Sequence, residues 1–302
     1  MEKLGMPGNI IPLQRIRENR RPSIKPVNRT SAAKKTRIFA ITSGKGGVGK
    51  TNIVANLGFA LSKLGKQVLI FDADLGLGNL DVLLGITPKY NLSHVINGLK
   101  PIEDVIVEGP GQIKILPASS GMQELTRLSL DQRFGLLKAL DGLIAQFDVM
   151  LIDTAAGISS NVLYFSVSAQ EIMVVVTPEP TSITDAYALM KILSLKYKET
   201  HFKLIVNSVD SEHEAEEVSR QLSLVADRFL DISIEYFGAI LCDANVKKGV
   251  MRQKVVSEMA PLTSASRSFS KLARKLCNSE PPEGCDKGGF FLHKEMLQKI
   301  AD

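Results

Sequence analysis

The sequence predicts an α/β fold, a doubly wound and mostly parallel sheet of about seven to eight strands flanked by helices. Short apolar runs recur along the chain, and the stretches between them are long enough for crossover helices. The first run, residues 38–41, leads into a glycine-rich loop and then into an apolar-periodic stretch over residues 53–64, in the order strand, loop, helix. With 302 residues, 44% of them hydrophobic, the chain is also long enough to bury a large core.

The later elements repeat this alternation. A helix is predicted after Pro261, because Phe269, Leu272, Ala273 and Leu276 recur on one helical face. A Pro-Pro-Glu-Gly break then separates it from a last short helix. The candidate strands after the first are residues 68–71, 113–116, 149–152, 172–176, 204–206 and 237–241.

Charge divides the chain into parts. The net charge of +5 is unevenly placed, since residues 1–37 carry +8 and the remainder carries −3. We expect a basic flexible arm over residues 1–36, a globular domain over residues 37–278, and a linker with a C-terminal amphipathic helix over residues 279–302. The basicity that suggests nucleic acid as a partner therefore belongs to the arm.

The cysteine content and the apolar runs predict a cytoplasmic protein. Cys242, Cys277 and Cys285 are too few and too irregularly spaced for a disulfide framework or a zinc site. The apolar runs are far shorter than the ~20 residues of a membrane span. Peripheral attachment to the inner face of the cell membrane stays open.

The loop after the first strand fits two motifs. As G-x-x-x-x-G-K-[ST], it is a phosphate loop in which backbone N–H groups surround an anion, Lys50 meets the β- and γ-phosphates, and the Thr51 hydroxyl ligates Mg²⁺. As G-x-G-x-x-G, it is a dinucleotide fingerprint with Asp72 as the ribose-binding acid. The loop residues that we expect to bind the nucleotide are Gly44, Lys45, Gly46, Gly47, Val48, Gly49, Lys50, Thr51 and Asn52.

Two features favour the triphosphate. A dinucleotide loop needs no lysine and hydroxyl residue after its last glycine, whereas a triphosphate with Mg²⁺ needs both. In addition, residues 149–152 form an apolar strand that ends in Asp153, the Walker B arrangement that holds Mg²⁺ through water. The sequence therefore predicts a P-loop NTPase fold with ATP or ADP and Mg²⁺ as ligands.

The segment K-G-G-V-G-K-T resembles the deviant Walker A sequence of the MinD/ParA ATPases, and the resemblance extends from Arg37 to about Pro261. It implies that Lys45 reaches across an ATP-sandwich homodimer to the partner's phosphates, as an arginine finger does. It also implies that residues 72–81 form switch I, in which Asp74 orients the attacking water and Asp72 lies nearer the metal. Residues 153–157 resemble switch II, in which Gly157 supplies backbone freedom.

The resemblance also implies contacts to the base and to a second protomer. Asn207, at the end of a predicted strand, matches the base-contacting Asn of the family. Asp243 falls in the late loop that borders the base, although Leu241 and Cys242 stand where the family often has Pro-Glu. Glu179 matches a position that touches the partner's nucleotide. Each of these residues also fits an ordinary polar position at a strand end.

Segments within residues 116–121 and 161–189 resemble the flagellar-number regulators of the FlhG or FleN type. This implies a slow ATPase that acts as a dimerisation switch, with an FlhF-type GTPase, flagellar switch proteins or a flagellar transcription activator as partners. The alternative is a ParA-like segregation ATPase, or a regulator that binds DNA or a transcription factor and uses ATP as a conformational cue.

The last helix, residues 290–301, begins at Phe290 and ends at Ala301. Helical spacing places Phe290, Leu292, Met296, Leu297 and Ile300 in one arc. Two interpretations stay open, a peripheral membrane anchor that dimerisation strengthens and a helix that packs its apolar stripe on the domain.

Overall fold

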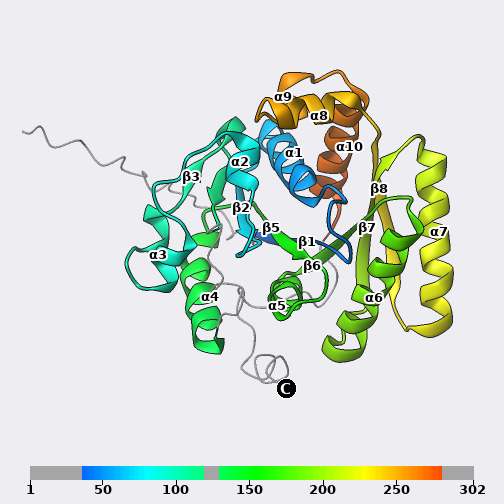
Figure 1. Cartoon of the computed structure of the whole chain (residues 1–302), viewed down its shortest axis with the longest axis horizontal. Coiled ribbons are helices and arrows are strands. Elements are labelled where there is room, and N and C mark those ends of the chain that lie inside the picture. Colours follow the sequence, from blue (N-terminus) through cyan, green and yellow to red (C-terminus); the bar gives the residue numbers. More distant parts are fainter. Residues whose placement is uncertain (1–35, 119–128, 281–302) are drawn as a thin grey trace, which may run out of the picture. The chain divides into compact units, whose positions relative to one another are not determined.

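The structure is a computed structural model that describes residues 36–118 and 129–280 (Figure 1). The predicted basic arm, apart from Thr36, and the predicted C-terminal amphipathic helix lie outside the described residues. The expectations for DNA binding by the arm and for membrane binding by residues 290–301 therefore stay predictions.

One sheet of eight strands forms the centre of the domain, in the order β3-β4-β2-β5-β1-β6-β7-β8. All pairings are parallel except that of β3 with β4, which is antiparallel. The strands are β1 (Arg37–Ser43), β2 (Val68–Ala73), β3 (Val107–Glu108), β4 (Lys114–Leu116), β5 (Val149–Ala156), β6 (Glu171–Val176), β7 (His201–Val209) and β8 (Ser233–Leu241).

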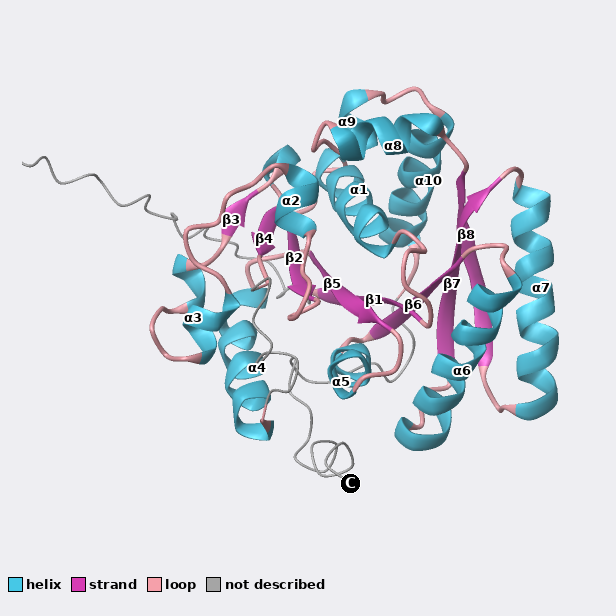
Figure 2. Ribbon diagram, in the orientation of Figure 1, coloured by secondary structure: helices cyan, strands magenta, loops and turns pink. Residues whose placement is uncertain are grey.

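Helices cover both faces of this sheet, as Figure 2 shows. They are α1 (Lys50–Lys63), α2 (Leu80–Leu84), α3 (Leu92–Ile96), α4 (Leu130–Ile144), α5 (Ser160–Ser168), α6 (Pro180–Tyr197), α7 (Glu212–Phe229), α8 (Ala244–Met251), α9 (Val256–Met259) and α10 (Ser264–Asn278). Short 3-10 turns lie at Ile102–Asp104 and Pro110–Gln112. None of the helices in the described ranges is long and apolar enough to cross a membrane.

The two faces hold separate hydrophobic clusters because side chains alternate along a strand. In β1, Phe39 and Ile41 pack with α1 and α10, whereas Ile38 and Ala40 pack with the helices of the opposite face. Both sides of the central strands are buried, so the strands consist of near-continuous apolar runs.

The predicted doubly wound sheet is confirmed, and each predicted strand overlaps an observed one. The helix expected after Pro261 is α10, and its four predicted face residues are buried. Strand β3 was not predicted, because two residues give no periodic signal.

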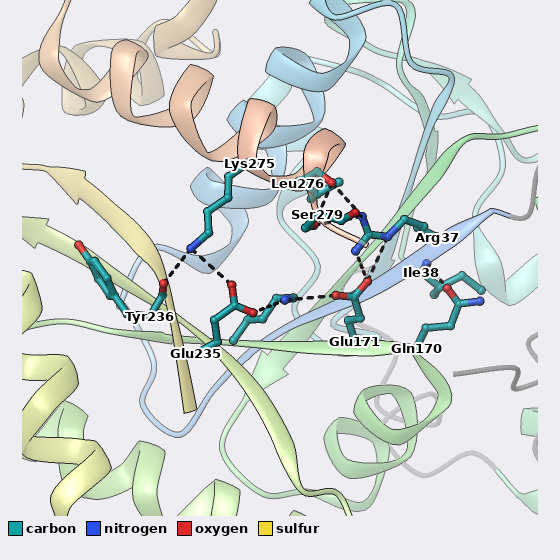
Figure 3. Close-up of polar contacts among 10 residues, drawn as sticks. Arg37, Ile38, Gln170, Glu171, Glu235, Tyr236, Lys275, Leu276 and Ser279 are labelled. Atoms are coloured by element: carbon teal, nitrogen blue, oxygen red, sulfur yellow. Dashed lines mark hydrogen bonds and ion pairs between the residues drawn. The ribbon is translucent and has the colours of Figure 1, made fainter. Parts of the chain in front are cut away.

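A network of ion pairs crosses the amino ends of the strands (Figure 3). The Glu171 side chain is only 1% exposed and pairs with Arg37 from β1 and with Lys203 from β7. Arg37 also donates hydrogen bonds to the carbonyl oxygens of Leu276, at 2.8 Å, and Ser279, at 2.7 Å. One guanidinium group thereby neutralises a buried carboxylate and satisfies carbonyl groups at the end of α10.

We expect Arg37→Ala to lower the free energy of unfolding by about 3 kcal/mol, because it leaves Glu171 buried with one weaker partner. The matched control is Arg220→Ala, which breaks an exposed pair with Glu217 and should change stability by less than about 1 kcal/mol. Urea unfolding followed by far-UV circular dichroism measures both, since the chain has no tryptophan. Equal losses for the two variants would contradict the role given to Arg37.

Candidate nucleotide-binding site

The glycine-rich loop joins β1 to α1, and its glycines are required by the backbone. Gly47 and Gly49 have φ of +79° and +90°, values that residues with a Cβ rarely adopt. Gly44 is required by packing, because a Cβ there would lie 2.1 Å from the Asp185 carbonyl oxygen in α6. The loop therefore has one backbone path, which ends with Gly49 at the start of α1.

Lys50 lies inside this loop and is buried. Its Nζ donates a hydrogen bond to the Ser43 hydroxyl at 2.8 Å. Burial lowers the pKa of the Lys50 ammonium, and the charges of Asp153 and Asp74 oppose that shift. An anion in the loop would supply the negative charge that this ammonium group lacks.

Two carboxylates lie side by side, one near the carboxyl end of β2 and one in the second half of β5. The register pairs Asp72 with Asp153, and both side chains are buried. Burial raises the pKa of Asp153 to about 7, against the lowering effects of a hydrogen bond with Thr51 and of the Lys50 charge. Burial also raises the pKa of Asp72 well above its usual range, and the charge of Asp153 adds to that shift.

These residues fit a Mg²⁺ ion held together with phosphate. Among the described residues, Oδ1 of Asp153 is buried without a hydrogen-bond partner, and the carboxyl group also contacts the Thr51 hydroxyl. The described ranges contain no group of three or more His, Cys, Asp or Glu side chains that could hold a metal ion alone. Mg²⁺ that takes its remaining ligands from phosphate and water suits such a site, because it retains water and needs few protein ligands.

Asp74 lies where β2 gives way to the next loop. Its carboxylate accepts a hydrogen bond from the Leu77 backbone at 3.2 Å, and its own N–H donates to Asp72 at 3.2 Å. Asp72 also accepts from the Leu80 backbone at 3.4 Å. The two acids therefore fix the course of the predicted switch I, and Asp74 is the less buried of the two.

The predicted switch II, residues 153–157, forms the second half of β5 and the glycine that follows it, and this glycine is tied to the glycine-rich loop. The Gly157 N–H donates to the Ser43 carbonyl oxygen at 2.9 Å. Gly157 has φ of +89°, and no atom lies within 4 Å of the place where its Cβ would be. A glycine is needed here for its backbone conformation and not for space.

Lys45 contacts the start of α6, whereas Lys50 contacts Ser43. The Lys45 ammonium group forms an ion pair with Glu179 and donates to the Thr181 hydroxyl at 2.9 Å. Glu179 and Thr181 lie at the start of α6, where Glu179 is the N-cap residue. Both charged side chains are substantially exposed, so the pair contributes little to stability and can separate readily.

A cleft of about 370 Å³ lies beside the loop, between the carboxyl ends of β7 and β8 and helix α8. Asn207 and Asp243 both line it. Burial alone would raise the pKa of Asp243, but hydrogen bonds from Asn245, Ala265 and Ser264 lower the pKa to about 2. The Asp243 carboxylate thus anchors the starts of α8 and α10. The lining residues are Gly47, Gly49, Asn52, Ile53, Asn207, Ser208, Ile240, Leu241, Cys242, Asp243, Val246, Lys247, Val250 and Phe269.

The structure brings the expected residues together in three groups. Lys50, Thr51, Asp72, Asp74 and Asp153 gather at the loop, Lys45 and Glu179 pair beside it, and Asn52, Asn207 and Asp243 line the cleft.

Two polar partners, Ser43 and Thr181, were not predicted from the sequence. Ser43 directly precedes the motif and Thr181 follows Glu179 by two positions, but no spacing rule singles out either residue.

Comparison with known proteins agrees with this geometry. A model of the AAA domain family matches residues 36–206. The antiactivator FleN of Pseudomonas aeruginosa is 46% identical, over 86% of this chain and 92% of that protein. The flagellum site-determining protein YlxH of Helicobacter pylori is 36% identical, over 88% of each chain. The solved structure of the septum site-determining protein MinD from Pyrococcus horikoshii, complexed with Mg-ADP, is 26% identical with a TM-score of 0.69, covering 81% of this chain and 97% of that one.

We expect Gly44→Ala to lower the free energy of unfolding by about 2 kcal/mol or more, because the new methyl group displaces the loop or the backbone of α6. Gly46→Ala is the matched control, since the nearest atom to its Cβ is 3.9 Å away and its stability should change by less than about 0.5 kcal/mol. Thermal unfolding without nucleotide separates the two. Equal melting temperatures would contradict the close packing at Gly44.

Proposed function

Because this chain belongs to the MinD/ParA family of P-loop ATPases, we propose that it is an ATP-dependent dimerisation switch that regulates the number and placement of flagella. As a member of this family, it binds ATP with Mg²⁺ and hydrolyses the nucleotide. The observation that supports dimerisation is the pair of loop lysines, of which Lys50 contacts Ser43 and Lys45 contacts Thr181 and Glu179 at the start of α6.

Lys50 and the loop amides hold the phosphates of the protomer's own nucleotide. The Lys50 ammonium leaves Ser43 for the β- and γ-phosphates, and the N–H groups around Gly47 and Gly49 surround the anion. Thr51 and Asp153 would hold Mg²⁺, with Asp72 nearby, and the bound ion would supply positive charge to offset the charge that develops on the phosphates. A bound cation would also offset the unfavourable free energy of burying the charges of Asp72 and Asp153 next to each other.

Asp74 orients the attacking water. Asp74 lies within the predicted switch I and is hydrogen-bonded there to Asp72, which is more deeply buried. The charge of Asp74 raises the pKa of Lys50. A carboxylate at this point accepts a proton from water or aligns that water in line with the γ-phosphate. Turnover is slow, so that the lifetime of ATP sets the lifetime of the dimer.

Lys45 supplies the contact that depends on a second copy. In the single protomer, Lys45 is paired with Glu179 and Thr181 at an exposed position. A phosphate group carries more negative charge than the Glu179 carboxylate and therefore replaces it as the partner of Lys45. In the dimer Lys45 reaches the partner's phosphates, and Glu179 is freed to lie beside the partner's nucleotide. Hydrolysis removes the γ-phosphate and returns Lys45 to Glu179.

The flagellar role rests on the two relatives that cover nearly the whole domain, whose names refer to an antiactivator and to flagellum site determination. The dimer surface would then bind an FlhF-type GTPase, flagellar switch proteins or a flagellar transcription activator. Membrane contact through residues 290–301 would add a second anchor on dimerisation. The alternative function is that residues 1–36 bind DNA.

With Mg·ATP, we expect wild-type protein to shift from monomer to dimer, Asp74→Ala to remain dimeric because hydrolysis stops, and Lys45→Ala to bind ATP as a monomer. Size-exclusion chromatography with light scattering measures the masses, and calorimetry measures ATP binding. Lys66→Ala, which changes a half-buried lysine outside the loop, is the control and should behave as wild type. If wild type and all three variants elute with one mass, the dimerisation switch is wrong.

In cells that carry Lys50→Ala on the chromosome, we expect the number or the position of flagella to change, because nucleotide binding is lost. Electron microscopy counts flagella per cell, and Lys66→Ala again serves as the control. Normal flagella together with uneven chromosome or plasmid inheritance would instead support the segregation alternative.

A further inference from the structure

Asn207 makes a contact that a base-binding residue does not need. Its side-chain Nδ2 donates a hydrogen bond to the backbone carbonyl oxygen of Val48 at 2.8 Å. Val48 lies within the glycine-rich loop and is 3% exposed, whereas Asn207 lies near the carboxyl end of β7. The contact thus ties the loop to a strand far away in the sequence.

This hydrogen bond sets the direction of a loop peptide. A trans peptide group points its carbonyl oxygen and its N–H to opposite sides. Asn207 holds the Val48 carbonyl oxygen on its own side, so the Gly49 N–H of the same peptide group points away from Asn207. Without this hydrogen bond, the peptide loses a constraint on its rotation.

The side-chain amide of Asn207 packs closely against Gly49. A Cβ at Gly49 would lie 2.4 Å from Nδ2 of Asn207. Ser208, directly after Asn207, has φ of +59°, an uncommon backbone value for a residue other than glycine. The register of β7 with β8 also shifts between Asn207 and Val209. An irregular strand end therefore presents the amide group to the loop.

We propose that Asn207 is a positioning residue for the phosphate loop in addition to lining the base cleft. This inference rests on the proposed ATP binding. The amide carries donors and an acceptor on different atoms, so Nδ2 holds the loop while Oδ1 remains an acceptor for the exocyclic amine of adenine. Base recognition and phosphate binding then share one side chain, and removing that side chain weakens both.

Inorganic tripolyphosphate with Mg²⁺ separates the two roles, because it has phosphates and no base. We expect Asn207→Ala in the full chain to bind tripolyphosphate about threefold to tenfold more weakly than wild type, the effect of one lost hydrogen bond. Affinity for Mg·ATP should fall further, since the base contact is lost as well. Competition against a fluorescent ADP analogue measures both.

Asn91→Ala is the matched control, because Asn91 is a hydrogen-bonded, part-buried asparagine that caps α3. It should lower the melting temperature while leaving both affinities at the wild-type value, which separates general destabilisation from loop positioning. Asn207→Ala with unchanged tripolyphosphate affinity and weakened ATP affinity would overturn the inference and leave the proposed function intact. Wild-type protein that binds neither ligand would instead refute the proposed function.

Discussion

Two acids buried side by side are the constraint on which the site depends. Asp72 and Asp153 are placed opposite each other by the register of β2 with β5, and burial raises the pKa of both. A protein gains nothing in stability from such an arrangement, since each charge disfavours the other. A bound cation and polyphosphate would compensate the two charges. Lys50, Thr51 and the amides of the glycine-rich loop lie beside the two acids and could bind these ligands.

Buried charges have different partners at the amino ends and at the carboxyl ends of the strands. At the amino edge, Glu171 is surrounded by Arg37 and Lys203, so the carboxylate is neutralised within the chain. At the carboxyl ends of the strands, Asp72 and Asp153 face each other, the buried Lys50 interacts with Asp153 and Asp74, and Lys45 is paired with Glu179 at the surface. The first arrangement is structural and permanent. The arrangement at the carboxyl ends needs a ligand to balance its charge, and ligands of open α/β sheets bind outside the carboxyl ends of the strands.

The fold was predictable because its signals are local. An apolar run, a G-x-x-x-x-G-K-[ST] loop and a helix can be recognised in a single window, and so can the apolar strand residues that precede Asp153, although β5 continues to Ala156. The contacts of Lys45 with Thr181, Lys50 with Ser43 and Asn207 with Val48 could not be predicted, because each joins side chains by the path of the chain in space. The sequence identified Asp243 as a base-loop residue, yet only the structure showed that its carboxylate holds two helix starts together.

In the proposed switch, a second copy of the chain completes the reaction, because Lys45 of the single protomer is paired with Glu179 and Thr181 at the start of α6. The most direct measurement is the rate of ATP hydrolysis per protomer as the protein concentration is raised at saturating Mg·ATP. We expect the rate per protomer to rise with concentration and then to reach a plateau, and we expect Lys45→Ala to abolish the rise. A rate per protomer that stays constant from the lowest to the highest concentration, in protein shown to bind ATP, would contradict the proposed switch.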